Sequence, residues 1–297
     1  MNPSIETLDA LSLAQHLKRK PDAHKGDAGK LLLIGGAPGM AGALVLAGQA
    51  GLYSGAGWVV LMMLDSHSAH VVPNQPELMV HDALNKQPLE ALANIQADVI
   101  AIGPGLGQSP LALQWLLAVL SWPVPVVVDA DAINLISKHG EALRALQQRE
   151  HPTVLTPHPG EAARLLTSNS ADVPSQRLQS VHALVNLTRS VVVLKGQHTL
   201  VASLTHNAVQ CLQGNAALAV GGSGDVLTGC IAAIAAQGKA HGLDLWQASC
   251  LAVQLHAVAA DSLVAKGVGP IGMTPSELLR ELRVCINAQT VIHKQGQ

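Results

Sequence analysis

The chain has 297 residues, of which 48% are hydrophobic and only 2% aromatic, and its formal net charge is −2. One tyrosine and no phenylalanine exclude the base-stacking surface of a single-strand nucleic-acid binder, and the scattered Lys and Arg residues form no basic patch. A chain of this length can bury a sizeable core, which here must be built from Ala, Val, Leu and Ile.

The sequence also predicts a cytoplasmic protein without a membrane or nucleic-acid partner. Every long apolar stretch contains Asp, Gly or Pro, so we expect no membrane span. The first ten residues lack the charged-then-apolar pattern of a signal peptide. Four cysteines without CxxC spacing are typical of small buried residues in a reducing compartment.

Strands and helices are expected to alternate along the chain, after a short amphipathic segment at 8–20 that predicts a surface helix. KLLLI at 30–34 predicts a buried strand, which a glycine turn, a helix at 43–54 and a second strand at 58–63 follow. This order indicates a parallel α/β sheet. Further strands are predicted at 98–102, 124–128, 153–155 and 190–195, a hairpin at 199–203 and 208–212, and helices at 111–120, 175–188, 226–237, 245–266 and 274–292. No linker or repeat interrupts this pattern, so we predict one domain over residues 1–297, with its core at about 8–290.

Glycine-rich or polar motifs directly follow several of the predicted strands. They are GPGLG at 103–107, DADAIN at 129–134, TPHPGE at 156–161 and KG at 195–196. In open α/β sheets ligands bind at the carboxyl edge, where such loops converge. We therefore expect all four motifs to line one site.

Two of these motifs carry ionisable groups whose role has a structural alternative. Of Asp129 and Asp131, one is expected to cap the following helix, and the other could hold a ligand hydroxyl or a metal-bound water. In TPHPGE, two prolines stiffen the backbone around His158, and Glu161 falls in the first turn of a helix. The motif is either a capped helix start or a site in which His158 contacts a polar substrate and Glu161 holds water on Mg²⁺ near phosphates. The flanking prolines favour the second interpretation.

The stretch GNAALAVGGSGDVLTG at 214–229 is the strongest signal in the chain. Its glycines precede an apolar helix, whose unpaired N–H groups would bind phosphate or another oxyanion. Asp225 is then either the helix cap or a base directed at the bound group, and the excess of glycine favours the base. A lysine at the end of strand 190–195 either reaches solvent or binds phosphates, so Lys195 is a candidate nucleotide ligand.

Taken in order, HKGDAGK, GMAGA, IGPGLG, VVDADAINLI, LTPHPGE, VVLKG and the loop at 214–229 resemble the ADP/ATP-dependent NAD(P)H-hydrate dehydratases over about residues 8–290. The resemblance implies a ribokinase-like three-layer α/β fold with a mostly parallel sheet. It also implies a lyase that repairs the S epimer of hydrated NADH or NADPH. ADP, or ATP in eukaryotic members, would be the co-substrate, and Mg²⁺ is the expected cofactor.

By this resemblance, Asp225 would deprotonate the hydrate hydroxyl as it receives a phosphoryl group, and Gly222 to Gly224 would form the anion hole. The resemblance assigns hydrate binding to Ala43, Gly105, Gly107, His158 and Asp225, and AMP binding to Lys195, Gly196, Gln197, His198, Thr199 and Gly224. Family members are often tetramers, so a homotetramer is expected. Many also carry an N-terminal epimerase domain, for which we expect no room here.

Two departures from the family pattern stand out. Leu218-Ala219-Val220 replaces a common Met-Ala-Thr before GGSGD, and Gln197 and His198 stand where small residues are usual. Two other functions remain open at this point. A ribokinase-like kinase for a vitamin precursor would use the same anion hole and base but keep the phosphate on its product. A nucleotide-sensing protein with an inactive site would bind without turnover, although Asp225, His158 and Glu161 argue against it.

Overall fold

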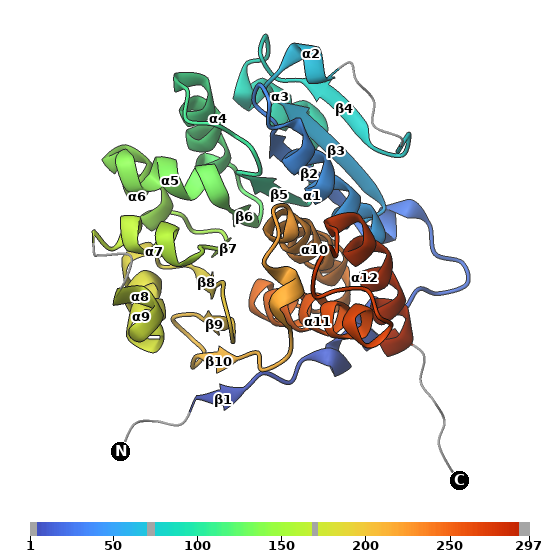
Figure 1. The fold of residues 1–297 in the computed structure, drawn as a ribbon. Helices are drawn as coiled ribbons and strands as arrows, with labels where there is room; N and C mark the ends of the chain where they lie inside the picture. The colour runs from blue at the N-terminus through green and yellow to red at the C-terminus, as the bar shows by residue number, and fades with distance from the viewer. Residues whose placement is uncertain (1–4, 70–74, 168–171, 291–297) are drawn as a thin grey trace.

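The computed structural model describes residues 5–69, 75–167 and 172–290, and a ten-stranded sheet runs through them (Figure 1). The strand order is β1-β10-β9-β8-β7-β6-β5-β2-β3-β4, and only β9 runs antiparallel to its neighbours. The strands are β1 (Glu6–Thr7), β2 (Lys30–Gly35), β3 (Trp58–Met63), β4 (Met79–Asp82), β5 (Val99–Ile102), β6 (Val126–Val128), β7 (Thr153–Leu155), β8 (Val191–Leu194), β9 (Leu200–Ala202) and β10 (Val209–Gln210).

Two layers of helices cover the sheet. In Figure 1, α10, α11 and α12 lie together on one side, whereas α4 to α9 lie on the other. The α-helices are α1 (Ala41–Tyr53), α2 (Ser66–Ala69), α3 (Pro88–Ile95), α4 (Pro110–Ser121), α5 (Ala130–Lys138), α6 (Gly140–Gln147), α7 (Pro159–Leu165), α8 (Asp172–Ser175), α9 (Arg177–Thr188), α10 (Ser223–Gly238), α11 (Leu245–Ala265) and α12 (Pro275–Thr290). Short 3₁₀ helices occur at η1 (Leu11–Leu17), η2 (Lys25–Ala28), η3 (Ala216–Leu218) and η4 (Lys239–His241).

Alternate residues of each central strand enter different cores, which explains why these strands are apolar throughout. In β2, Leu31 and Leu33 pack with α1, α10 and α11, whereas Leu32 and Ile34 pack with α3 and α4 on the opposite face. A parallel strand that is buried on both faces reads as a continuous apolar run. The predicted three-layer α/β architecture is therefore confirmed.

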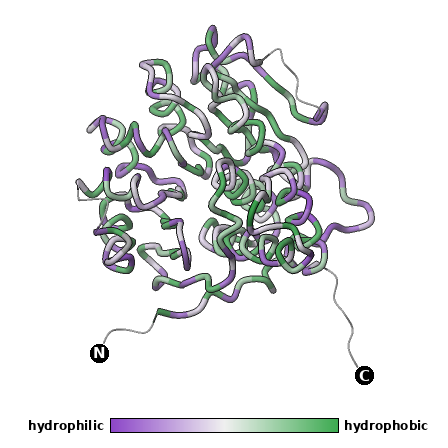
Figure 2. The backbone as a smooth tube through the Cα atoms, viewed as in Figure 1, coloured by the Kyte–Doolittle hydropathy of each residue, from purple (hydrophilic) through white to green (hydrophobic). Residues whose placement is uncertain are grey.

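The helix α10 is the most deeply buried of the helices, and its small residues have a packing reason. Every residue from Val226 to Gly238 is buried. A Cβ at Gly229 would lie 2.0 Å from the carbonyl oxygen of Ala47, so α1 and α10 approach backbone to backbone. The chain of α10 is accordingly among the most hydrophobic parts of Figure 2, while the segment between η1 and β2 is largely hydrophilic.

The structure corrects several expected elements. The N-terminal segment forms a 3₁₀ helix rather than an α-helix, with Ala14 and Leu17 buried, and it is preceded by the unpredicted strand β1. The edge strand β4 and the helices α3 and α6 were also unpredicted. The hairpin formed by β9 and β10 is confirmed.

The expectation that no apolar stretch is long enough to span a membrane is contradicted by α11, which contains Asp261 and is nevertheless long and apolar enough by length and composition. However, most of α11 is buried within the protein, where it packs beside α10 and α12. The length and apolar composition of α11 are those of a helix at the centre of the core.

The sheet topology gathers the predicted motifs at one edge. The strands β8, β7, β6, β5 and β2 are consecutive neighbours and mutually parallel, so their carboxyl ends lie side by side. The loops that follow them contain the glycine turns, DADAIN, TPHPGE and the KG motif.

Candidate active site

The centre of the candidate site is a buried carboxylate, Asp129, at the end of β6. Its Oδ1 accepts hydrogen bonds from Lys195 Nζ at 2.7 Å and Thr156 Oγ1 at 2.6 Å, and its Oδ2 accepts one from Thr228 Oγ1 at 2.7 Å. These partners come from the end of β8, the end of β7 and the first turns of α10. One side chain thus ties three elements together at the carboxyl edge of the sheet.

The expectation that either Asp129 or Asp131 caps the following helix is wrong. Asp129 occupies the N-cap position of α5, but its side chain makes no capping hydrogen bond there. Asp131 instead accepts a hydrogen bond from the backbone N–H of Gly107 at 2.9 Å. Asp129 and Asp131 therefore accept hydrogen bonds from other loops of the site rather than from the N-terminus of α5.

Lys195 and Asp129 form an ion pair in which both groups are charged. Burial alone would lower the pKa of Lys195, but the charges of Asp129, Glu161 and Asp225 outweigh it and raise that pKa. Burial likewise opposes ionisation of Asp129, yet Lys195 and the two threonine hydroxyls hold its pKa below the usual range. Opposite charges at this distance in a buried site stabilise each other's ionised form.

Asp225 lies in the first turn of α10, beside this pair. A Cβ added to Gly224 would lie 3.4 Å from Lys195 Nζ, which places the ammonium group against the start of the helix. Burial, together with the charge of Asp129, raises the pKa of Asp225 to about 7, although Lys195 acts in the opposite direction. A carboxyl group with a pKa near neutrality is suited to general base catalysis.

The glycine loop before α10 is held in place from α11. The carboxylate of Asp261 accepts hydrogen bonds from Gly214 N at 2.9 Å and from Asn215 Nδ2 at 2.7 Å. The buried His256 Nε2 lies 3.0 Å from the carbonyl oxygen of Ser223, to which it donates as the neutral ring, since burial lowers its pKa to about 4. Both contacts fix the path of the chain into α10.

Gly222 enters the helix in a conformation that other residues adopt only with strain. Its φ is 95°, and an added Cβ would lie 2.6 Å from Leu46 Cδ1 and 3.0 Å from Pro275 Cγ. The departure at Leu218 and Val220 lies in this same loop. The Leu218 side chain packs against the core, whereas Val220 is 37% exposed.

The two remaining glycine turns interlock. The N–H groups of Gly36 and Ala37 donate to the carbonyl oxygens of Pro104 and Gly105 at 3.1 and 2.7 Å. Gly105 has a φ of 57° and lies against Met40. The turn after β2, the start of α1 with Ala43 and the loop Gly103–Gly107 are thereby brought into one surface.

His158 and Glu161 hold each other at the start of α7. Glu161 Oε2 accepts a hydrogen bond from His158 N at 2.8 Å, and His158 Nδ1 accepts one from Gly160 N at 3.0 Å. His158 Nε2 also lies 3.2 Å from Glu161 Oε1, with the histidine side chain half exposed and the glutamate buried. The capped helix start is confirmed, and the same contacts hold the His158 imidazole in place.

The loop Lys195–Thr199 leaves β8 in a turn with two residues at positive φ, Gly196 and His198. The guanidinium of Arg177, at the start of α9, donates to three carbonyl oxygens of this loop and the strand before it. Sequence reasoning missed this arginine, as it missed His256 and Asp261. No local motif marks these residues, because their partners lie 17 to 47 positions away along the chain.

The residues fit a magnesium ion only in combination with a phosphate ligand. Within residues 5–69, 75–167 and 172–290, no three His, Cys, Asp or Glu side chains cluster as a ready metal cage. Mg²⁺ characteristically keeps several waters and uses one or two carboxylates together with substrate phosphates. Glu161 fits a role through water, because its Oε2 accepts a hydrogen bond from His158 N and its Oε1 contacts His158 Nε2, which leaves each oxygen able to accept another.

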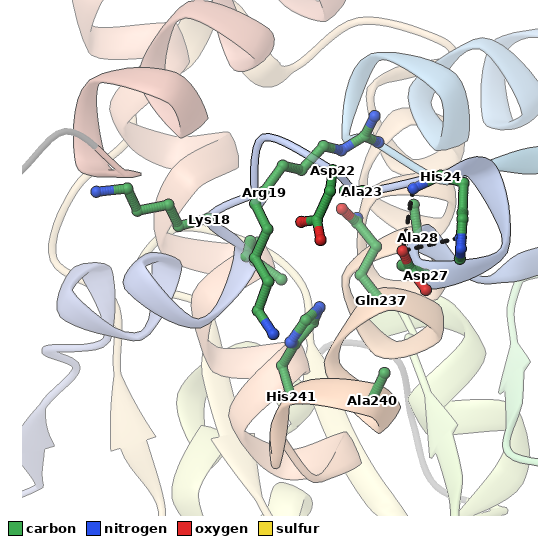
Figure 3. Close-up of a pocket in the computed structure, with 12 residues that line it drawn as sticks. Lys18, Arg19, Asp22, Ala23, His24, Asp27, Ala28, Gln237, Ala240 and His241 are labelled. Atoms are coloured by element: carbon green, nitrogen blue, oxygen red, sulfur yellow. Dashed lines mark hydrogen bonds and ion pairs between the residues drawn. The ribbon is translucent and has the colours of Figure 1, made fainter.

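A separate hollow of about 390 Å³ lies at the far end of α10, between η4 and the segment that precedes β2 (Figure 3). Three of its lining side chains already have partners: His24 Nδ1 lies 3.0 Å from Asp27 Oδ2, and Arg19 donates to the carbonyl oxygen of Gly55 at 2.6 Å. We assign no ligand to it.

Comparison with known proteins identifies the family. The family model described as NAD(P)H-hydrate dehydratase matches residues 31–283. The chain belongs to the NAD(P)H-hydrate dehydratase family. It is 39% identical over 286 residues to the bifunctional NAD(P)H-hydrate repair enzyme Nnr of Escherichia coli (strain K12), covering 96% of this chain and 53% of that protein. The chain thus spans about half the length of the first curated relatives it matches.

Two further similarities concern proteins of comparable length. The ADP-dependent (S)-NAD(P)H-hydrate dehydratase of Neisseria meningitidis serogroup B is 38% identical over 266 residues, which cover 88% of this chain and 86% of that protein. The crystal structure of the Bacillus subtilis ADP/ATP-dependent NAD(P)H-hydrate dehydratase, co-crystallised with ATP and Mg²⁺, superimposes with a TM-score of 0.83 at 28% identity. That alignment covers 97% of this chain and 99% of the other. The dehydratase family and the ribokinase-like fold expected from the sequence are therefore confirmed.

Proposed function

We propose that this protein is an ADP-dependent lyase that converts the S epimer of NADH or NADPH hydrate back to the intact dinucleotide. The main support for this proposal is the environment of the Asp225 carboxyl group. Its pKa is raised to about 7 in the first turn of α10, among backbone N–H groups and beside the Lys195 ammonium. A base next to an anion site is the arrangement that phosphoryl transfer to a hydroxyl requires.

In the proposed reaction, Asp225 accepts the proton of the hydrate hydroxyl as that oxygen bonds to the terminal phosphorus of ADP. The bond from this phosphorus to its bridging oxygen breaks, and AMP leaves. The phosphate ester then loses its carbon–oxygen bond as the ring nitrogen donates its electron pair. Loss of a proton from the neighbouring ring carbon restores the double bond, so the products are the dinucleotide, AMP and phosphate.

Each site residue has a role in this scheme. Gly222 and Gly224 would present N–H groups to the transferred phosphoryl group, and Lys195 would offset its developing charge. Ala43, Gly105, Gly107 and His158 would bind the hydrate, with His158 held in place by Glu161. The AMP portion would lie on Lys195, Gly196, Gln197, His198, Thr199 and Gly224.

The co-substrate and cofactor are part of the same proposal. The N. meningitidis relative is named ADP-dependent, which supports ADP here. Mg²⁺ would be held by the nucleotide phosphates and by water on Glu161, and when bound it would neutralise phosphate charge. A cytoplasmic homotetramer formed by one domain over residues 1–297 is the expected setting.

Turnover of hydrated NADH, run with ADP and ATP side by side, tests this function. We expect the dihydronicotinamide absorbance to return with ADP, together with one AMP and one phosphate per turnover. A ribokinase-like kinase would consume nucleotide without restoring the absorbance. Asp225→Asn should abolish turnover but retain ligand binding, and unchanged turnover in this variant would exclude the mechanism.

A further inference from the structure

The turn that follows β8 is held by the guanidinium of Arg177, which pairs with no acidic side chain of residues 5–69, 75–167 and 172–290. Arg177 Nη2 donates to the carbonyl oxygens of Leu194 at 2.9 Å and His198 at 3.3 Å, and Nη1 donates to that of Lys195 at 3.3 Å. A Cβ added to Gly196 would lie 2.9 Å from Nη1, so the guanidinium lies directly against the turn. Two carbonyl groups of the turn and one at the end of β8 are therefore directed at Arg177.

The N–H groups of the same turn remain available to a ligand. Among the described residues, no backbone hydrogen bond uses the N–H of Gly196, Gln197 or His198 as donor. Gly196 and His198 have φ values of 129° and 54°, a conformation that costs free energy for a non-glycine residue and persists only where surrounding contacts enforce it. Successive free N–H groups in such a turn form a concave site for an anion.

The charge of Arg177 is also uncompensated. None of the ion pairs in the described part of the chain involves this residue, and its Nε is buried without a hydrogen-bond partner. Burial lowers the pKa of Arg177, but an arginine stays protonated at neutral pH. The full positive charge therefore lies against the turn, where its field favours a bound anion.

We propose that Arg177 is a positioning residue for the nucleotide: it holds the turn Lys195–Thr199 by its carbonyl groups so that the turn's N–H groups bind the phosphates of ADP. This inference rests on the proposed function for the identity of the nucleotide. Arg177 acts through the backbone of the turn, and none of its side-chain hydrogen bonds within the described residues reaches Asp225. It should consequently affect nucleotide affinity rather than the chemical step.

The chain contains a matched control in Arg149. Its guanidinium also donates to backbone carbonyl groups, those of Val119, Leu120, Trp122 and Val124, and no described acidic side chain pairs with it. These residues precede β6, and its other partner, Thr153, begins β7. Arg149 thus makes the same kind of contact at the opposite edge of the sheet, away from the site.

The experiment measures AMP and adenosine binding by calorimetry in the wild type and in Arg177→Met, Arg177→Lys, Arg149→Met and Arg149→Lys. We expect Arg177→Met to weaken AMP binding about tenfold, because both the charge and the fixed turn are lost, with adenosine affinity changed less than about twofold. Arg177→Lys keeps the charge but cannot bridge three carbonyls, so its AMP affinity should lie between those of Arg177→Met and the wild type. Arg149→Met should lower the melting temperature but leave AMP affinity unchanged.

Steady-state kinetics on the same variants complete the test. In Arg177→Met, KM for ADP should rise about tenfold while kcat at saturating ADP changes less than about threefold. Equal loss of AMP affinity in Arg149→Met, or wild-type affinity in a folded Arg177→Met, would overturn the inference while leaving the proposed function intact. A wild type that binds no nucleotide would overturn both. A wild type that binds AMP without dehydrating the hydrate would overturn the proposed function alone, and the binding data would still decide the role of Arg177.

Discussion

At the scale of single residues, the site is a set of four acids with one lysine among them. Asp129, Asp131 and Glu161 all raise the pKa of Asp225, and Lys195 lowers it. The lysine is paired with Asp129 rather than with Asp225, so Asp225 keeps its proton to higher pH than its neighbour does. The geometry thus separates a permanently charged carboxylate from one that can exchange a proton near neutral pH.

The raised pKa predicts a pH profile. Since the base must be deprotonated, kcat/KM for the hydrate at saturating ADP should rise about tenfold per unit below pH 7 and level off above it. Asp225→Asn should lose about a thousandfold in activity above pH 7 and should lack this rise with pH. Initial rates between pH 5.5 and 9 measure this, and a flat profile through pH 7 would contradict the assignment.

The same group predicts a pH-dependent change in stability. A folded-state pKa above the unfolded value of 3.8 means that the folded protein binds the extra proton between about pH 4 and 7, so stability falls as pH rises through that window. Asp225→Asn lacks this cost and should be more stable than the wild type above pH 7, by on the order of 2 kcal/mol. Urea denaturation at pH 4.5 and pH 8 should show the difference appearing only at the higher pH.

The two members of the buried ion pair should shift the pH profile in opposite directions. Asp129→Asn removes a charge that raises the pKa of Asp225, so the profile should move about one unit lower; Lys195→Met should move it about one unit higher. Each should also cost roughly 3 kcal/mol, since it leaves the buried partner unpaired.

The control for this pair is Lys239→Met. Lys239 pairs with Asp98 at 3.4 Å, and its side chain is 59% exposed. This variant should cost less than about 1 kcal/mol and leave the pH profile in place. If Asp129→Asn and Lys195→Met moved the profile in the same direction, the charge argument would be wrong.

At the scale of elements, α10 links the anion site to the core. Its N-terminal glycines form the site's backbone, while its small buried residues allow α1 to approach closely. The contacts from Asp261 and His256 on α11 then fix where the helix begins. A substitution in this loop should therefore affect both the site and the packing of α10.

Alanine substitutions at Gly222 and Gly221 test whether the backbone conformation of this loop matters. Gly222→Ala should destabilise the protein by about 1–3 kcal/mol and impair turnover, because the residue has a φ of 95° and an added Cβ would approach Leu46 and Pro275. Gly221 has no heavy atom within 4 Å of an added Cβ, so Gly221→Ala should change stability by less than about 0.5 kcal/mol. Equal effects on thermal melting would show that loop flexibility, rather than this conformation, matters.

At the scale of the whole molecule, the two cores on either side of the sheet share every central strand. Cys211, Cys230, Cys250 and Cys285 are all buried and free, and all belong to the core on the α10 and α11 side. Burial raises the pKa of Cys230 and Cys250 to about 12, which keeps these thiols unreactive.

Thiol labelling therefore reports global opening of this core. A native sample should react slowly with an aromatic disulfide reagent, and all four thiols should react together in denaturant. Saturating ADP should slow the native reaction, because a ligand bound only by the folded state lowers the population of the unfolded one. Rapid native labelling of one thiol would indicate local opening instead.

The sequence by itself determined the fold class and the main line of the site. Continuous apolar strands, each followed by a glycine or polar motif, specify a parallel sheet with its ligand edge, and GGSGD before an apolar helix specifies α10. These signals are local, because the burial of a strand and the start of a helix depend on residues that are neighbours in the sequence. Edge elements such as β1 and β4 were missed, since both strands are short and partly exposed and lack the continuous apolar run of the central strands.

Only the tertiary structure decided how the motifs meet. The sequence left one of Asp129 and Asp131 as a helix cap, whereas the fold places Lys195, Thr156 and Thr228 around Asp129, and hydrogen bonding to them replaces the cap. The fold likewise places Arg177 against the turn after β8 and His256 against the carbonyl group of Ser223. Such contacts join residues up to 99 positions apart. Their chemistry depends on burial and proximity, which no local pattern in the chain records.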